Sequence, residues 1–292
     1  MTGPGMEGTP SRILRELQSR HPFRFRRSLS QNFLVDPMAL EGIARAVGAG
    51  PGDTVLEVGA GAGFLTRELL RSGARVLAVE LDPVMAGLLR EVTGDHPNLS
   101  VIEADILALD ITALLDREGV RKCMVAGNLP YHVTTPALFH ILATRDRVER
   151  MIFTVQREVG VRMAAGPGTK DYGALSLAVA YGGTCERIFG VPAAAFVPRP
   201  KVDSVVVRLV PVAGRLHGEV ERRFFSVVRA AFGQRRKMLL NSVARAFGGR
   251  EEAARALAAA GIGKDRRGET LSLEDFIRLA GDAGRGNGGK AG

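Results

Sequence analysis

The fold of this chain is set by residues 55–64, Val55-Leu56-Glu57-Val58-Gly59-Ala60-Gly61-Ala62-Gly63-Phe64. The first four predict a short buried strand, the glycines a turn, and the residues from Phe64 to Arg71 a helix. Glycines at such a turn let a ligand approach the backbone and bring the helix N-terminus towards it. A dinucleotide fingerprint needs G-x-G-x-x-G, but the sixth position counted from Gly59 is Phe64. The E-x-G-x-G-x-G spacing therefore indicates a nucleoside cofactor without a pyrophosphate.

Strands and helices alternate on both sides of this turn. Further strands are expected at Arg75–Val79, Leu99–Ile102, Cys123–Ala126, Met151–Val155, Cys185–Val191 and Val205–Val210. Helices are expected at Pro83–Val92, Pro136–Ala143 and Ala174–Ala180. This alternation predicts an α/β fold, a Rossmann-like and mainly parallel seven-stranded sheet wrapped by helices. The last two strands are close enough along the chain to form an antiparallel pair.

The pattern changes after Pro211, where the strands stop. Four helices are expected, at Val220–Phe232, Lys237–Phe247, Glu251–Ala260 and Leu271–Leu279. We therefore expect a flexible basic arm over residues 1–27, an α/β domain over 28–212, a small all-helical domain over 213–280 and a disordered tail over 281–292.

Composition narrows the class of protein. The chain has 292 residues, 46% of them hydrophobic, and no apolar run long enough to span a membrane. Its N-terminus is rich in arginine and has no long apolar segment, so a secretory signal is not expected. Cys123 and Cys185 lie in apolar stretches without histidines at ligand spacing, so we expect buried thiols rather than a disulfide or a metal site. These features predict a cytoplasmic protein, and we expect a monomer.

The net charge of +9 is unevenly distributed. Residues 1–30 carry 6 Lys+Arg against 2 Asp+Glu, residues 31–212 carry 18 against 20, and residues 213–292 carry 16 against 9. The excess positive charge thus lies in the N-terminal arm and the C-terminal segment. Basic ends on a neutral-to-acidic middle indicate a polyanionic partner, and nucleic acid is favoured over a membrane because no basic helix has an aromatic face.

Two acids follow neighbouring strands of the predicted sheet. Glu80 ends the second strand, 21 residues after Gly59, where it can accept hydrogen bonds from ribose hydroxyls. Asp105 ends the third strand, where it can accept from an adenine amino group. Either acid alone is more often a surface carboxylate at a strand end. Together with the glycine turn they predict a nucleoside site.

The stretch Asn128-Leu129-Pro130-Tyr131 follows the fourth strand and suits an amino group. The Asn128 side-chain oxygen and the carbonyl of Leu129 or Pro130 can both accept from one –NH₂, while the proline fixes the backbone and Tyr131 offers a stacking face. Taken alone, these four residues fit a proline-containing turn better. Their place at the carboxyl end of a strand, beside a nucleoside site, favours the amine pocket.

Together these features resemble the class I S-adenosylmethionine-dependent methyltransferases, and Asn-Leu-Pro-Tyr is similar to the motif of those that methylate exocyclic or amide nitrogens. Three further segments resemble motifs of the ribosomal RNA adenine dimethyltransferases: Ser28–Leu34, Phe196–Ser204 and Phe232–Lys237. With the helical C-terminal domain, the likeness runs from about Arg27 to Leu279 and is strongest to the small-subunit (16S) dimethyladenosine transferase family. The chain departs from that family's pattern at Ser30, where glycine is usual, and at Ala60, where proline is frequent.

The resemblance implies an enzyme that uses S-adenosylmethionine to dimethylate two adjacent adenosines near the 3′ end of 16S rRNA, with a role in ribosome biogenesis. The cofactor would be bound by Asn32, Leu34, Gly59, Gly61, Glu80, Asp105 and Asn128, and the flipped base by Asn128, Leu129, Pro130, Tyr131 and Phe196. Arg235, Arg236 and Lys237 would contact RNA phosphates. For Phe196 a core aromatic is an equally good interpretation, and for the three cations a solvated helix start remains open.

Two other functions remain. A 23S rRNA adenine methyltransferase of the resistance type would share the catalytic domain, although the C-terminal motifs favour the small subunit. A ribosome-assembly checkpoint protein would act mainly by binding through its basic domain. A DNA-adenine or protein-glutamine methyltransferase would be expected to carry Asn-Pro-Pro-Tyr, and position 129 is Leu.

Overall fold

The computed structural model describes residues 5–21, 32–129, 133–214, 216–233 and 237–282. Two compact units make up the chain. The first joins Met1–Gly160 to Thr184–Pro211, and the second joins Val161–Gly183 to Val212–Gly292. Both cysteines are free thiols, as expected, but only Cys123 is buried, whereas Cys185 is partly exposed. Among the described residues, no helix is both long and apolar enough to cross a bilayer.

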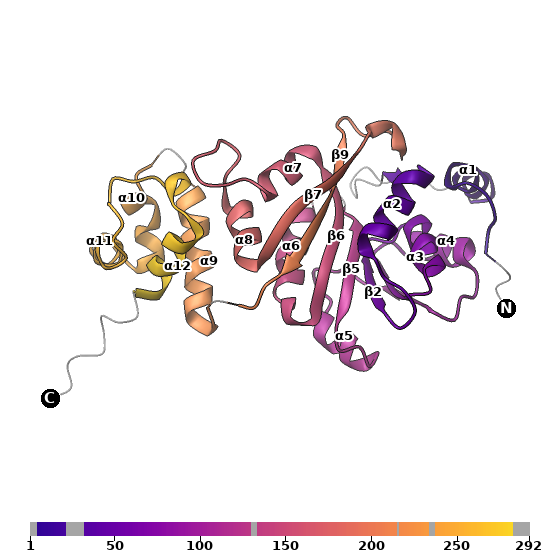
Figure 1. Cartoon of the computed structure of the whole chain (residues 1–292), viewed down its shortest axis with the longest axis horizontal. Coiled ribbons are helices and arrows are strands. Elements are labelled where there is room, and N and C mark those ends of the chain that lie inside the picture. The colour runs from indigo at the N-terminus through magenta and orange to yellow at the C-terminus, as the bar shows by residue number, and fades with distance from the viewer. Residues whose placement is uncertain (1–4, 22–31, 130–132, 215, 234–236, 283–292) are drawn as a thin grey trace. The chain divides into compact units, whose positions relative to one another are not determined.

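The first unit is built on a seven-stranded sheet in the order β4-β3-β2-β5-β6-β9-β7 (Figure 1). Its strands are β2 (Thr54–Val58), β3 (Arg75–Glu80), β4 (Leu99–Glu103), β5 (Cys123–Asn128), β6 (Val148–Gln156), β7 (Gly183–Val191) and β9 (Ser204–Pro211). The pairs from β4 through β6 are parallel, whereas β9 runs antiparallel to β6. The predicted mainly parallel sheet is confirmed, and β7 and β9 are neighbours at its edge.

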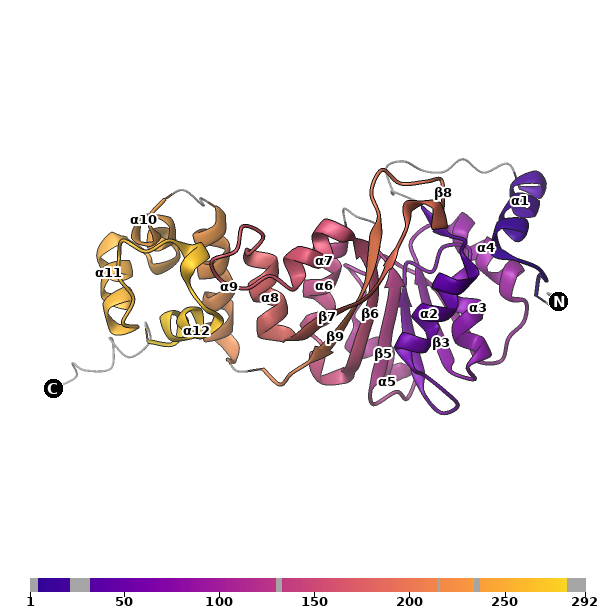
Figure 2. The same cartoon turned by 45° about the horizontal axis from the view of Figure 1, so that its top comes forward.

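Helices cover both faces of this sheet (Figure 2). They are α2 (Pro37–Val47), α3 (Phe64–Arg71), α4 (Pro83–Thr93), α5 (Ile111–Arg117) and α6 (Thr134–Leu142). Buried residues of α2, α3 and α4 form one core with the face that carries Val55, Val76 and Met124, and α5 and α6 lie on the other face. Proline in the first turn and an aspartate N-cap start both α2 and α4, which fixes where these helices begin.

Part of the basic N-terminal arm, which was predicted to be flexible, forms a helix packed on the first unit. Helix α1 (Pro10–Arg20) buries Ile13, Leu14 and Leu17 in the core of the first unit. Just before it, the Met6 N–H donates to the Val92 carbonyl at 3.0 Å. The prediction failed because the apolar spacing 13, 14, 17 gives α1 a face that can be buried, which outweighs the basic composition of the arm.

A two-stranded sheet links two motifs that lie far apart in the sequence. Strand β1 (Phe33–Leu34) pairs antiparallel with β8 (Phe196–Val197), with Leu34 opposite Phe196. The Val35 N–H also donates to the Ala195 carbonyl at 2.9 Å. Strands of two residues have no readable alternation, so the sequence did not predict this pair.

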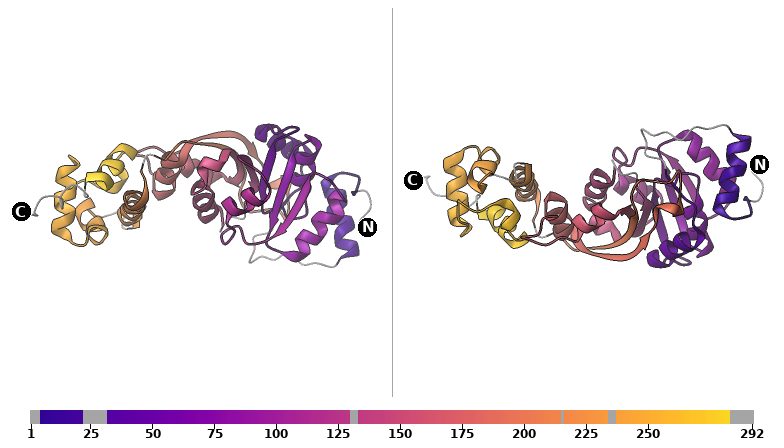
Figure 3. Two further views of the ribbon diagram at one scale, coloured as in Figure 1. Left: turned by 90° about the horizontal axis from the view of Figure 1, so that it is seen from below. Right: turned by 90° about the horizontal axis from the view of Figure 1, so that it is seen from above.

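The second unit is mainly helical (Figure 3). It contains the C-terminal end of α7 (Arg157–Met163), then α8 (Ala174–Gly182), α9 (Gly218–Gly233), α10 (Leu239–Val243), α11 (Arg250–Ala259) and α12 (Leu273–Asp282). The chain passes into this unit at Val212, close to the expected boundary. Val161–Gly183 also belongs to this unit, however, and not to the α/β domain as expected. The reason is packing, because Tyr172, Leu177 and Tyr181 lie in the same core as Phe224.

Candidate functional site

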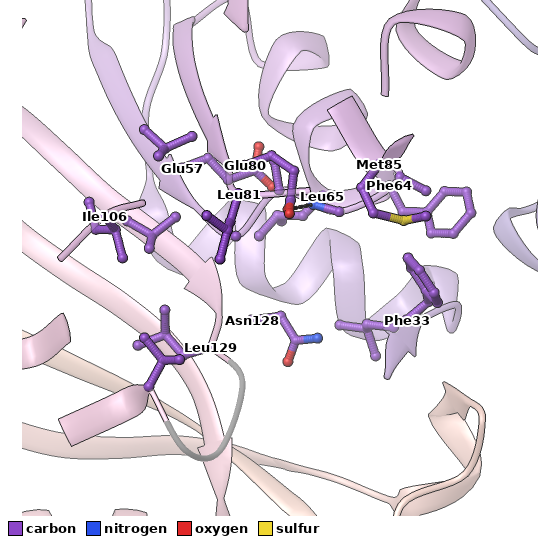
Figure 4. A pocket seen from close by; sticks show the side chains of 18 of the residues that line it. Phe33, Glu57, Phe64, Leu65, Glu80, Leu81, Met85, Ile106, Asn128 and Leu129 are labelled. Atoms are coloured by element: carbon purple, nitrogen blue, oxygen red, sulfur yellow. Dashed lines mark hydrogen bonds between the residues drawn. The ribbon is translucent and has the colours of Figure 1, made fainter. Parts of the chain in front are cut away.

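A cavity opens at the carboxyl edge of the parallel strands (Figure 4). Its lining includes every described residue that was predicted to bind the cofactor or the target base: Asn32, Leu34, Gly59, Gly61, Glu80, Asp105, Asn128, Leu129 and Phe196. These residues come from four parallel strand ends and from the β1–β8 pair. The structure thus brings into one place residues that are up to 164 positions apart in the sequence.

The glycine turn after β2 forms the floor of the cavity. Gly59, Gly61 and Gly63 have φ angles of 69°, 57° and 82°, in the left-handed region that other residues rarely adopt. The Gly59 N–H donates to the Val79 carbonyl at 2.9 Å, which ties the turn to β3. The backbone therefore lies bare against the space where a ligand would bind.

Glu80, at the end of β3, faces this turn. One carboxylate oxygen accepts from the Gly61 N–H at 2.8 Å and the other from the Asp82 N–H at 2.9 Å. Burial raises the pKa of Glu80, and these backbone hydrogen bonds partly oppose the rise. The carboxyl group is thus held in a fixed position at the cavity wall.

Glu57 also lines the cavity, although the sequence did not predict a role for it there. Its side chain is 1% exposed, lines the cavity, and accepts a hydrogen bond from Thr66 Oγ1 at 2.6 Å. Burial raises its pKa to about 8, and the charge of Glu80 adds to the rise. The available signal was an acid within the apolar run of β2, because an acid inside a buried strand must face either a core or a site.

Asp105 and two apolar side chains form the far wall. Asp105 is exposed, and its carboxylate accepts from the Leu107 N–H at 2.9 Å. Leu81 lines the same cavity although 52% of its surface is exposed, and Ile106 lies beside it (Figure 4). An exposed leucine beside a fixed acid suits a flat heterocycle with polar edges.

Asn128 ends β5 on the opposite side of the cavity. Its Nδ2 donates to the Asn32 carbonyl at 3.0 Å, so Oδ1 is the atom left to accept from a ligand. Gly127 precedes it, and a Cβ there would lie 2.5 Å from the Val58 carbonyl oxygen, which only glycine avoids. Leu129 is 2% exposed, and Pro130 and Tyr131 lie outside the described residues.

Phe196 fits both interpretations that the sequence left open. Its side chain is 3% exposed and belongs to the hydrophobic core, yet it also lines the cavity.

Of the three cations predicted to contact RNA, Lys237 lies in the second unit and is exposed. Arg235 and Arg236 lie outside the described residues. The proposed roles of Phe196 and of these cations stay predictions.

The lining suits a cationic nucleoside. Glu57, Glu80 and Asp105 face the cavity, and none of its described lining residues is Lys, Arg or His. The glycines of the turn have no side chains, so a ligand can lie close to their backbone, and the apolar walls can hold a purine ring. S-adenosylmethionine, with a sulfonium and an ammonium group, matches this lining. Within the described part of the chain, no cluster of His, Cys, Asp and Glu could hold a metal ion.

A mainly parallel seven-stranded sheet with this site at its carboxyl edge defines a class I methyltransferase. The family model described as "Ribosomal RNA adenine dimethylase" matches residues 22–280. The chain belongs to that family.

Relatives in several bacteria extend over nearly the whole chain. "Ribosomal RNA small subunit methyltransferase A" of Alkaliphilus oremlandii is 41% identical over 91% of this chain and 94% of its own length. The protein of the same name from Geobacter metallireducens is 44% identical over 88% of this chain and 94% of its own.

Solved structures agree on the fold. The 23S rRNA methyltransferase ErmE superposes with a TM-score of 0.62 and 28% identity, covering 87% of this chain and all of its own. A dimethyladenosine transferase from Plasmodium falciparum gives 0.67 at 23% identity, covering 84% of this chain and 94% of its own. The second likeness supports the fold alone.

Proposed function

We propose that this protein dimethylates the exocyclic amines of two adjacent adenosines near the 3′ end of 16S rRNA in the small ribosomal subunit, using S-adenosylmethionine. The observation that carries the proposal is the position of Asn128 at the cavity edge, with Nδ2 held by Asn32 and Oδ1 left as an acceptor. The small-subunit target is supported by relatives of about 40% identity that bear that name.

Methyl transfer to an adenine amine mainly requires that the protein hold the amine in the right position. An adenine amine is a weak nucleophile because its lone pair is delocalised into the ring. Asn128 Oδ1, together with a carbonyl of the following residues, would accept its N–H bonds and turn the lone pair towards the methyl group. The bound cofactor supplies that methyl as an electrophile. Phe196 would pack against the flipped base, and the contribution of these residues is positioning and dipoles.

The cofactor would be held by the residues already described. Gly59 and Gly61 would admit it against the backbone, Glu80 would accept from ribose hydroxyls, and Asp105 would accept from the adenine amine. Leu81 and Ile106 would enclose the adenine ring. In the second unit, Lys237 with Arg235 and Arg236 would contact RNA phosphates.

The test uses labelled S-adenosylmethionine and unmethylated small subunits, with the label mapped by primer-extension stops. Asn128→Ala should lower methyl transfer about 100-fold or more, the size of effect seen when one positioned hydrogen-bonding group is removed, while small subunits still bind. Asn98→Ala is the control, because Asn98 lies just before β4, at the other end of the strands.

The similarity to ErmE keeps a 23S target as the second candidate. Label in 23S rRNA but not in 16S rRNA would establish that alternative. Subunit binding without any methyl transfer by the unmodified protein would instead favour an assembly role.

A further inference from the structure

The cavity places two buried carboxyl groups side by side, with no cation among the described residues that line it. Glu57 pairs with Ala78 across β2 and β3, so Glu57 and Glu80 lie on the same face, one strand and two residues apart. Their side chains are 1% and 8% exposed. Two buried acids that share a space repel each other when both are charged.

The groups around Glu57 do not neutralise it. From β3 it faces Glu80, which has Asp82 beside it, and from the end of β4 Asp105 faces the same cavity. From β5 the polar lining residue is Asn128, from the β1 segment it is Asn32, and from α3 Thr66 donates a hydrogen bond. No described lining residue is a cation.

Such a site responds to the charge of its occupant. With a pKa of about 8, Glu57 is mostly protonated at neutral pH when the cavity holds no cation. A cation within a few ångströms favours the carboxylate, and in a buried site the interaction is weakly screened. The proposed cofactor carries a sulfonium, whereas the product left after methyl transfer carries a neutral thioether. Both keep the α-ammonium group, so the two ligands differ by one positive charge.

We propose that Glu57 distinguishes the cofactor from its spent product, which has one positive charge fewer, by releasing a proton when the cofactor binds and taking one up when only the product remains. This inference rests on the proposed function. The O–H bond of the carboxyl group breaks and the proton passes to the buffer, with no other bond or electron involved. Product release is then favoured because the protonated site has lost the ion pair that held the cofactor.

The test is calorimetric and needs no turnover. S-adenosylmethionine and S-adenosylhomocysteine are titrated into the protein at pH 7 in phosphate and in Tris, whose ionisation enthalpies differ. Both ligands carry the same α-amino group, so its titration cancels in the comparison. We expect S-adenosylmethionine to release close to one proton more than S-adenosylhomocysteine. As the pH rises towards 8, the affinity for S-adenosylmethionine relative to S-adenosylhomocysteine should increase by about threefold to tenfold per pH unit.

Two variants assign the effect to Glu57. Glu57→Gln should remove the extra proton and flatten the pH dependence of the ratio. Thr66→Val keeps the acid but removes a hydrogen bond that favours its charged form, so the pH dependence should move to higher pH. Glu41→Gln, an exposed acid on α2, is the control and should behave like the unmodified protein.

The outcomes are separable. Equal proton release with both ligands, or a pH-dependent ratio that survives Glu57→Gln, overturns this inference and leaves the proposed function standing. Failure of both ligands to bind overturns the two together.

Discussion

At the scale of single residues, Thr154 places a hydroxyl group inside the sheet. It is 1% exposed on β6, in register with Asn128 of β5, and its Oγ1 has no partner among the described residues. A buried hydroxyl without a partner costs about 1–3 kcal/mol. Thr154→Val keeps the shape and removes that cost, so the free energy of unfolding should rise by about 1 kcal/mol in urea titrations.

Thr93→Val is the matched control for this substitution. Thr93 is also buried, but its hydroxyl donates to the Leu89 carbonyl at 2.8 Å, so losing it should lower the free energy of unfolding by about 1 kcal/mol. A loss of stability in both variants would show that Thr154 has a partner in solution.

Glu57 also makes stability depend on pH. Its pKa is about 8 in the folded protein and 4.5 when unperturbed. Because the folded state binds the proton more tightly, the stabilisation is complete below pH 4.5 and is lost as the pH rises through 8, by at most about 1.4 kcal/mol per pH unit. Urea titrations from pH 5 to 9 should show this decline in the unmodified protein relative to Glu57→Gln. If the difference in free energy of unfolding between the two proteins stays constant with pH, the prediction is wrong.

At the scale of elements, the docking of α1 is the sharpest departure from the sequence-based expectation. Leu17 is fully buried, and truncation of such a leucine costs about 2–5 kcal/mol. In Leu17→Ala, amide hydrogens of residues 10–20 should exchange faster, as measured by mass spectrometry. Arg12→Ala changes an exposed side chain of the same helix and should leave exchange unaltered. If α1 were a loose arm, neither variant would alter exchange.

The elements also show what the sequence could and could not predict. The strands that end in Glu80 and Asn128 were predicted because buried parallel strands are continuous apolar runs. Caps and prolines marked where helices such as α4 begin. The β1–β8 pair was missed because it rests on contacts between residues 33–34 and 196–197, which no local pattern encodes. Glu80, Asp105 and Asn128 were predicted from their positions at strand ends, and they line the cavity. Asn32, Leu34 and Phe196 were inferred from the family resemblance, and the burial of Glu57 needed the packed structure.

At the scale of the whole molecule, the division into units follows the core and not the chain. Tyr172 and Tyr181 belong to the helical core although strands β7 and β9 of the sheet follow them in the sequence. Tyr172 donates to the Leu271 carbonyl at 2.9 Å and Tyr181 to Glu221 at 2.8 Å. A boundary placed at residue 212, where the predicted strands stop, could not anticipate a segment that leaves the first unit and returns to it.

The uneven charge of the molecule predicts how RNA binding should respond to salt. Residues 213–292 carry 16 Lys+Arg against 9 Asp+Glu, while residues 31–212 are slightly acidic. Each phosphate that a cation neutralises adds about 0.7–0.9 to the slope of log affinity against log salt concentration. If Lys237 contacts a phosphate, Lys237→Ala should lower that slope by about one and weaken binding at low salt.

Lys122→Ala provides the comparison within the same molecule. Lys122 is also exposed, but it precedes β5 at the end of the strand away from Asn128. Filter binding of small subunits between 50 and 300 mM salt, on the order of the range where phosphate contacts dominate, should therefore give the unmodified slope for Lys122→Ala. If both variants lower the slope of log affinity against log salt concentration equally, net charge alone attracts the RNA. Lys237 would then make no specific contact with a phosphate.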